Sequence, residues 1–514
     1  MEIILGLLGV ALIGLAIFAY SFAKRPQCLT SWPSRVLPLQ SGQTKLDRLI
    51  EPLTSTTPNA SGLFLLAENI NSFAARLDSA NYAQRSLDLQ YYYWKNDLTG
   101  KLLCRAIVEA AERGVRVRLL LDDINAHGLD TTYLALDSHN NIEVRLYNPA
   151  TNRGHRFRRS LELIFRYASM SRRMHNKSWI ADGRMAIVGG RNIGDAYFDA
   201  SESVSFRDID VLVIGRAVSD AEQIFDRYWN SSSSLSIRAL HRIRNPKLKR
   251  LMARLESFYR SYNATRFMNL VRDCESCKTV FQVADNFHWT NEASIVADPP
   301  NKVKGDKSDI LLAHKIQSLM QSAAIDIEIV SPYFIPGYRG VAQLQSIVSR
   351  GVNVSVLTNS LAATDVIAVH GAYAKYRKPI LESGVTLFEL KQRGIKKKSS
   401  LFGSSSASLH TKSFVIDDCD GFIGSFNLDP RSTAINTEMG VFFRHPVLAR
   451  ELKEIFQLQT SSKFSYRIQL HDGALRWDHH SNSDGNDLTH EPETSFARRL
   501  LAQLVGMLPI ESQL

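Results

Sequence analysis

The chain has 514 residues, of which 44% are hydrophobic, 22% charged and 9% aromatic. This balance is typical of a globular protein of about two to four domains, and it excludes collagen-like and wholly disordered chains. Basic residues number 62 against 51 acidic ones, and the net charge of +11 favours an anionic partner: a phosphate ester, a phospholipid surface or a nucleic acid. A mildly basic surface without such a partner is the simpler alternative.

Residues 3–23 carry no charge and are the one stretch apolar enough to span a bilayer, which excludes a polytopic transporter. As a helix rising about 1.5 Å per residue, they would extend about 30 Å, the thickness of the hydrocarbon core. A cleaved signal peptide is the alternative, but its start should be basic, and here Glu2 takes that place. We predict a retained transmembrane anchor over residues 1–23. Lys24 and Arg25 follow it and favour a cytoplasmic body.

The residues after the anchor predict a linker and then two related α/β repeats. Residues 24–60 are polar and rich in Pro, Ser and Thr, as in a linker. Apolar runs and helical periodicity then alternate, with strands at 87–93, 115–121 and 142–146 and a helix at 102–112. The same order returns, with strands at 325–330 and 352–357 and a helix at 340–349. We predict repeats over 61–280 and 281–460 and a C-terminal extension over 461–514. The amphipathic segment 496–507 of this extension is expected to pack onto the body, with contact to the membrane as the alternative.

A short motif, His-x-Lys-x4-Asp, occurs once in each predicted repeat, and an Asn follows each His at position +17. The residues are His175, Lys177, Asp182 and Asn192 in the first copy, and His410, Lys412, Asp417 and Asn427 in the second. One copy would be a weak signal, because so short a pattern arises by composition, but two copies at the repeat spacing are specific. Because alternate residues of a strand share one face, each His and its Lys are expected to point into the same space.

Two histidines suit a two-step transfer of a phosphodiester. One neutral imidazole attacks phosphorus, while the other protonates the leaving alkoxide and then deprotonates the incoming hydroxyl. The motif lysines supply positive charge to the phosphate oxygens, and Asn192 and Asn427 can donate amide hydrogens to the same oxygens. No cluster of residues has the spacing of metal ligands, so we predict neither a metal nor another cofactor.

Four carboxylates lie near the motif in sequence. A nucleophilic His needs a carboxylate on its other ring nitrogen, and Asp208 and Glu438 are candidates because each precedes an apolar strand downstream of its motif. A carboxylate that caps the end of a strand is the alternative reading of both. Asp182 and Asp417 are expected to hold a turn rather than to take part in the chemistry.

The twin motif resembles that of the phospholipase D superfamily, whose members carry two H-x-K-x4-D motifs, and the resemblance spans residues 61–460. Within it, the chain is most similar to bacterial cardiolipin synthases of the C type, through the stretches 91–100, 206–210, 370–373 and 508–514. The resemblance implies two pseudo-symmetric α/β repeats, each a mixed sheet flanked by helices, that form one active site at their interface. It also implies that His175 is the nucleophile, which forms a phosphohistidine, and that His410 is the acid and base.

The resemblance implies a phosphatidyltransferase of the bacterial inner membrane that makes cardiolipin. Phosphatidylglycerol would be the acceptor, and a second phosphatidylglycerol or a phosphatidylethanolamine would be the donor. A hydrolytic phospholipase D that releases phosphatidic acid is one alternative, and a phosphodiesterase or nuclease of the same superfamily is another. The apolar anchor argues against nucleic acid, because binding DNA needs no attachment to a bilayer. A non-catalytic scaffold is a third alternative, and the two intact motifs argue against it.

Overall fold

The computed structural model describes residues 33–150, 153, 160–162, 165–201, 204–240, 247–273, 287–305, 312–392, 406–478 and 488–514. The predicted transmembrane anchor over residues 1–23 lies outside these ranges. Among the helices in these ranges, none is both long enough and apolar enough to cross a bilayer.

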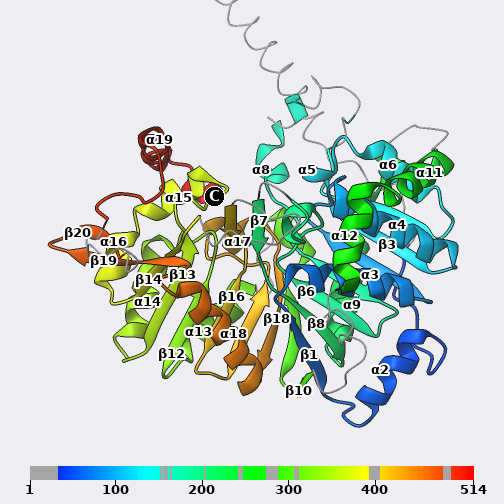
Figure 1. Cartoon of the computed structure of the whole chain (residues 1–514), viewed down its shortest axis with the longest axis horizontal. Helices are drawn as coiled ribbons and strands as arrows, with labels where there is room; N and C mark the ends of the chain where they lie inside the picture. The colour runs from blue at the N-terminus through cyan, green and yellow to red at the C-terminus, as the bar shows by residue number, and fades with distance from the viewer. Residues whose placement is uncertain are drawn as a thin grey trace, which may run out of the picture.

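Two nine-stranded sheets lie side by side, one in each half of the chain (Figure 1). The first has the order β10-β1-β8-β6-β5-β2-β3-β4-β9 and is mixed, because β2, β3 and β4 run parallel while β5 and β6 pair antiparallel. Its strands are β1 (Ser61–Leu66), β2 (Ser86–Tyr91), β3 (Arg116–Asp122), β4 (Ile142–Tyr147), β5 (Ser178–Ala181), β6 (Met185–Gly189), β8 (Asp210–Gly215), β9 (Ser234–Ser236) and β10 (His288–Thr290).

The second sheet repeats this topology. Its order is β11-β18-β17-β16-β12-β13-β14-β19-β20, and the run from β11 to β19 matches the run from β1 to β9 strand by strand. Its strands are β11 (Ala293–Ala297), β12 (Asp326–Val330), β13 (Asn353–Asn359), β14 (Thr386–Leu390), β16 (Ser413–Ile416), β17 (Asp420–Gly424), β18 (Met439–Arg444), β19 (Ser465–His471) and β20 (Ala474–Asp478). The duplication predicted from the sequence is therefore present in the fold. A third, two-stranded sheet joins β7 (Val204–Arg207) to β15 (Ser406–Leu409).

Helices flank both sheets (Figure 1). Those of the first half are α2 (Lys45–Ser55), α3 (Asn69–Tyr82), α4 (Leu98–Glu112), α5 (Asp123–Ala126), α6 (Asp130–Asp137), α8 (Tyr167–Met170), α9 (Val218–Trp229), α10 (Ile237–Leu240), α11 (Leu248–Tyr259) and α12 (Tyr262–Asp273), with a 3-10 turn η1 (Asp195–Tyr197). Those of the second half are α13 (Leu312–Gln321), α14 (Gly337–Val348), α15 (Ile367–Ala374), α16 (Arg377–Glu382), α17 (Pro430–Ala434), α18 (Pro446–Thr460) and α19 (Phe496–Gly506), with the 3-10 turns η4 (Pro300–Lys304) and η5 (Glu511–Gln513).

An apolar core joins the two halves. One cluster of buried side chains combines β6, β8 and α9 of the first half with β17, β18 and α18 of the second. Val188, Val211 and Trp229 belong to it from one side, and Val441 and Leu448 from the other. Because this core is continuous, the ends of the central strands of both sheets are held at one junction.

Some elements fall outside the predicted repeats. Helix α2 lies within the predicted linker, where Thr44 and Asp47 form a capping box that starts the helix. Strands β19 and β20 lie in the predicted C-terminal extension, yet they complete the second sheet. The other partner of β19 is β14, which is distant in sequence, and β20 joins the sheet only through β19, so no local pattern in the extension indicated that the sheet continues.

Candidate active site

The two motif strands occupy the same central place in their sheets. Strand β5 lies between β6 and β2, and β16 lies between β17 and β12. His175 and His410 come just before these strands, at the junction of the halves. The side chains of Lys177 and Lys412 are buried there.

Asp182 and Asp417 hold the turns that follow the motif strands. Both adopt a positive φ, of 52° and 51°. The Asp182 carboxylate accepts hydrogen bonds from the backbone N–H groups of residues 84–86 at 2.7–3.1 Å, which fasten β5 to the start of β2. Asp417 accepts from residues 324–326 at 2.7–3.0 Å in the same way. Within the described ranges neither carboxylate bonds to a motif His or Lys, so we assign both a structural role.

Replacing Asp182 with Ala is expected to lower the free energy of unfolding by about 3 kcal/mol, because it leaves buried N–H groups without an acceptor. Urea denaturation followed by circular dichroism measures this change. Asp472→Ala is the matched control, since Asp472 also has a positive φ, of 50°, but lies exposed in the turn between β19 and β20. Equal stability losses in both variants would contradict the structural role of Asp182.

Each motif His bonds to a carboxylate from the opposite half. Nδ1 of His175 lies 2.8 Å from Oε2 of Glu438, and Nδ1 of His410 lies 2.6 Å from Oδ2 of Asp208. Each predicted carboxylate therefore bonds to the imidazole of the other repeat. Asp208 of the first repeat bonds to His410, and Glu438 of the second repeat bonds to His175. The Nε2 atom of each His is thereby left as the atom that can face a substrate.

Backbone pairing across the junction produces this exchange. Strand β15 pairs with β7 in parallel, and the N–H of His410 donates to the carbonyl of Arg207 at 2.8 Å, which brings Asp208 beside His410. On the other side, the N–H of His175 donates to the carbonyl of Thr437 at 2.9 Å, which brings Glu438 beside His175. Strand β7 lies between the two halves in Figure 1.

The residue opposite each carboxylate differs between the halves. Gly190 faces Asp208, and a Cβ at this position would lie 2.4 Å from the Asp208 carboxylate. The equivalent residue in the second half is Ser425, whose hydroxyl donates to Glu438. Ser432 donates a further hydrogen bond to Glu438 at 2.9 Å. The carboxylate of Glu438 thus receives two hydroxyl bonds, whereas no hydroxyl of the described residues bonds to Asp208.

The two His–carboxylate pairs, here called dyads, also differ in charge. Burial alone would raise the pKa of Glu438, but His175, Lys177 and Ser425 outweigh burial and hold this pKa below its ordinary value. For Asp208, burial raises the pKa to about 7, although Lys412 opposes the shift. The Glu438 dyad therefore keeps an ionised carboxylate at neutral pH, whereas the Asp208 dyad takes up a proton near neutrality.

Burial also lowers the pKa values of the basic groups. It lowers the pKa of His175 to about 4, despite the nearby Glu438, so this imidazole is neutral. The pKa of His410 falls well below its ordinary value through burial and then the charge of Lys412. Burial lowers the pKa of Lys177 to about 7 and that of Lys412 to about 8. Since Lys177 depresses the pKa of His410 and Lys412 that of His175, the four groups form one electrostatic cluster.

The two asparagines differ in their bonds. The side chain of Asn192 donates to the hydroxyl of Tyr197 at 3.2 Å, and this hydroxyl lies 3.4 Å from Nε2 of His410. The side chain of Asn427 is buried, and its oxygen has no partner in the described part of the chain. The unpartnered atom of Asn427 is thus an acceptor, whereas the amide N–H of Asn192 is bonded to Tyr197.

Aromatic side chains that the sequence analysis did not select surround both imidazoles. The ring of Tyr92 lies 5.1 Å from that of His175, edge to face. The rings of Tyr197 and Phe206 lie 5.1 and 5.2 Å from that of His410. Tyr92 and Phe206 belong to stretches that supported the family resemblance, and this was the signal that could have found them.

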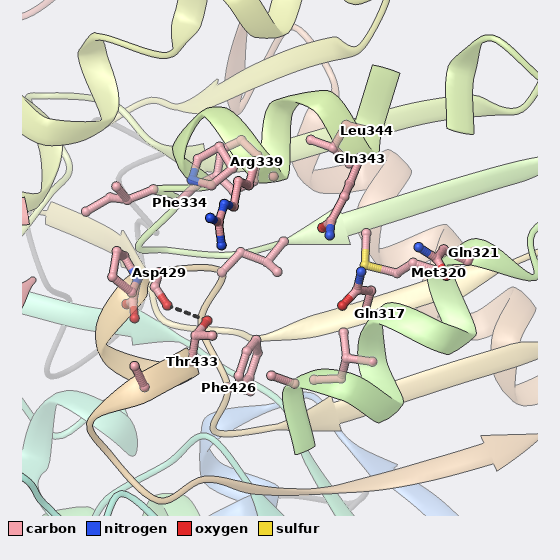
Figure 2. A pocket seen from close by; sticks show the side chains of 18 of the residues that line it. Gln317, Met320, Gln321, Phe334, Arg339, Gln343, Leu344, Phe426, Asp429 and Thr433 are labelled. Atoms are coloured by element: carbon pink, nitrogen blue, oxygen red, sulfur yellow. Dashed lines mark hydrogen bonds between the residues drawn. The ribbon is translucent and has the colours of Figure 1, made fainter. Parts of the chain in front are cut away.

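An apolar cavity of about 380 Å³ adjoins the Asn427 loop. It lies among α13, α14 and α17, and Phe426 and Leu428, the two neighbours of Asn427, line it (Figure 2). Figure 2 shows Met320, Phe334 and Leu344 around the cavity, with the longer polar side chains of α13 and α14 near them. Because three separate segments form this cavity, no local sequence pattern predicted it.

A family model described as "Cardiolipin synthase, PLD-like domain" matches residues 76–229 and 316–459, and each of these ranges contains one copy of the motif. The chain belongs to the phospholipase D superfamily. It is an enzyme of this superfamily, as the sequence predicted.

Relatives align with almost the whole chain. Cardiolipin synthase C of Escherichia coli K12 is 41% identical over 91% of this chain and 99% of its own length. Cardiolipin synthase 1 of Bacillus cereus is 24% identical over 78% of this chain and 67% of its own length. The crystal structure of a phosphatidylserine synthase from Haemophilus influenzae Rd KW20 shares the fold, with a TM-score of 0.55 at 13% identity over 89% of this chain and 99% of that one.

Proposed function

We propose that this superfamily member transfers phosphatidyl groups between phospholipids and makes cardiolipin at the bacterial inner membrane. The crossed pair of His–carboxylate dyads beside two buried lysines is the observation that carries the proposal. The 41% identity to a cardiolipin synthase over 91% of the chain supports this substrate class. The apolar cavity beside Asn427 supports a lipid substrate, since it is of a size and lining that suit part of an acyl chain.

In the first step, Nε2 of His175 attacks the phosphorus of the donor lipid. His175 is neutral, and within the described ranges no hydrogen bond occupies its Nε2. The bond from phosphorus to the headgroup oxygen breaks, and His410 passes to this oxygen the proton that its pair with Asp208 holds near neutrality, so that glycerol or ethanolamine leaves. A phosphohistidine forms, and the ionised Glu438 stabilises the positive charge that appears on the His175 ring.

In the second step, His410 takes a proton from a hydroxyl of phosphatidylglycerol. The hydroxyl oxygen attacks the phosphohistidine, the P–N bond breaks, and His175 returns to its neutral form. Lys177, Lys412 and the amide of Asn427 stabilise the charge on the phosphate oxygens in both steps. The buried histidines and their aromatic surroundings favour a lipid hydroxyl over water as the acceptor.

Labelled phosphatidylglycerol tests this function in vesicles that contain the full-length protein. With phosphatidylglycerol alone, we expect labelled cardiolipin and free glycerol, and with added phosphatidylethanolamine the release of ethanolamine identifies that lipid as donor. The His175→Ala variant is the control for background turnover. Phosphatidic acid as the only labelled product would show a hydrolytic phospholipase D instead.

The lowered pKa values predict how kcat/KM depends on pH. The lysines of the free enzyme are protonated below pKa values of about 7 and about 8, so their attraction for phosphate is lost as the pH rises through this range. His175 stays neutral down to about pH 4, so the nucleophile remains available on the acid side. We therefore expect kcat/KM to fall above about pH 7. In Lys177→Arg the guanidinium stays charged, so the alkaline fall should become less steep, because only Asp208 and Lys412 still titrate there, with pKa values of about 7 and about 8. An unchanged alkaline limb in this variant would contradict the assignment.

A further inference from the structure

Helix α19 exposes its large apolar side chains. These are Phe496, Leu500, Leu501 and Leu504, together with Met507 and Leu508 in the turn that follows, each between 43% and 78% exposed. Phe496, Leu500 and Leu504 are four residues apart and therefore lie along one face of the helix. In a globular protein such a face normally packs against the core. The prediction that segment 496–507 packs onto the body is thus wrong for its large side chains.

The opposite, small-residue face of α19 packs against α15. Ala502 and Gly506 are buried there beside Gly371. A Cβ on Gly371 would lie 2.4 Å from the carbonyl oxygen of Ala502, and a Cβ on Gly506 would lie 2.6 Å from the carbonyl oxygen of Gly371. So close an approach of the two backbones leaves no room for larger side chains. The helix cannot turn its leucine face inward, and its orientation is determined by this contact.

Two arginines fasten the C-terminal segment to the rest of the chain. Arg498 of α19 donates hydrogen bonds to the carbonyls of Leu361 and Thr364, both at 3.0 Å. Arg431 of α17 binds the carbonyl of Gln513 at 3.0 Å and that of Ser171 in the first half. Ser171 lies four residues before His175. The chain end is therefore attached where the two halves meet beside the motif.

Further apolar side chains of the first half are exposed on the same edge. Figure 1 shows α19 at the edge of the molecule that also carries α5, α8 and α15. Ile124 of α5 and Tyr167 of α8 are exposed there. Residues 495–509 include no acidic residue but contain Arg498 and Arg499. An apolar face of net positive charge is complementary to an anionic lipid surface.

We propose that α19 and its following turn dock on a phospholipid bilayer, with the face from Phe496 to Leu508 inserted at the boundary between headgroups and acyl chains. The choice of a bilayer as the occupant rests on the proposed function, because a substrate that resides in a membrane must reach the two histidines from it. Docking along this edge places the active site next to the lipid surface independently of the predicted N-terminal anchor.

A fluorescent reporter on α19 tests the insertion directly. In the full-length protein, with its native cysteines replaced, a cysteine at Leu504 carries an environment-sensitive dye. In vesicles of phosphatidylglycerol and phosphatidylethanolamine, we expect a blue shift of the emission and quenching by lipids with a quencher in the acyl chain. The same dye at Leu458 of α18, which is 60% exposed but belongs to another surface, is expected to show neither change. An unshifted, unquenched emission at Leu504, or contact there with a second protein molecule instead, would overturn the proposal.

A double variant, Leu500→Asp with Leu504→Asp, tests the consequence for activity. We expect the rate on vesicle-bound lipid to fall about tenfold, and the rate on a soluble short-chain phospholipid to stay unchanged. Leu458→Asp should leave both rates unchanged, and thermal melting shows that each variant is folded. Equal rates of the double variant and the wild type on vesicles would overturn the proposal. If the wild-type protein transfers neither kind of lipid, the proposed function fails, whereas the dye experiment still reports on docking.

Discussion

His175→Ala is expected to abolish the transfer reaction, with a loss of at least about 1,000-fold in kcat, because it removes the nucleophile as well as one of the two dyads. His410→Ala should lose a similar factor, because no group then protonates the leaving oxygen. The two variants differ in what accumulates. With a donor whose leaving group needs no proton, His410→Ala should still form the phosphohistidine, and His175→Ala should not. Radiolabel that stays on the protein after acid-free denaturation measures this intermediate.

His288→Ala is the matched control for these variants. His288 also bonds to a carboxylate, that of Glu451 at 2.9 Å, but it lies on an edge strand away from the motif. Its replacement should leave kcat unchanged. A labelled His175→Ala protein together with an unlabelled His410→Ala protein would reverse the assignment of the two histidines.

The crossed dyads predict an unusual pattern of coupling between variants. Glu438→Gln should lower kcat by about 100- to 10,000-fold, because the carboxylate that orients His175 and stabilises its charged form is lost. In the His175→Ala background the same change should have almost no further effect, since its partner is already absent. Combined with His410→Ala, it should still lower the rate. Steady-state and single-turnover rates of the single and double variants form the required cycles.

The matching cycle uses Asp208→Asn, which should couple to His410 and not to His175. If Glu438 instead coupled to His410, the histidine in its own repeat, the exchange across the junction would be refuted. Circular dichroism is needed beside each rate, because both carboxylates are buried and their loss can also weaken the fold.

The duplication and the motif residues were readable from the sequence because both are local patterns. A strand of period two and a helix of period 3.6 leave their marks within about ten residues, and the second copy of the motif repeats the first. Predicted strands such as 325–330 and 352–357 accordingly match β12 and β13 closely. The ends of the repeats were less readable, because β10 and β19 join their sheets through partners far away in the chain, and β20 joins only through β19.

The orientation of α19 shows a limit of periodicity. The spacing of Phe496, Leu500 and Leu504 indicates that one face of the helix is apolar, but it does not say which face meets the protein. The close contact between Gly371 and Gly506 decides this, and the two residues lie far apart in the sequence. Only the tertiary structure could show that the small face is the buried one.

The sequence by itself therefore determined the chemical groups of the site: two histidines, two lysines and two carboxylates, selected by type and spacing. The tertiary structure decided which groups act together. The pairing of β15 with β7, and of Met174 with Thr437, carries Asp208 to His410 and Glu438 to His175. It also decided their charges, because burial raises the pKa of Asp208, whereas His175, Lys177 and Ser425 hold that of Glu438 below its ordinary value. Both are properties of contacts between segments distant in the chain, and spacing along a sequence does not encode them.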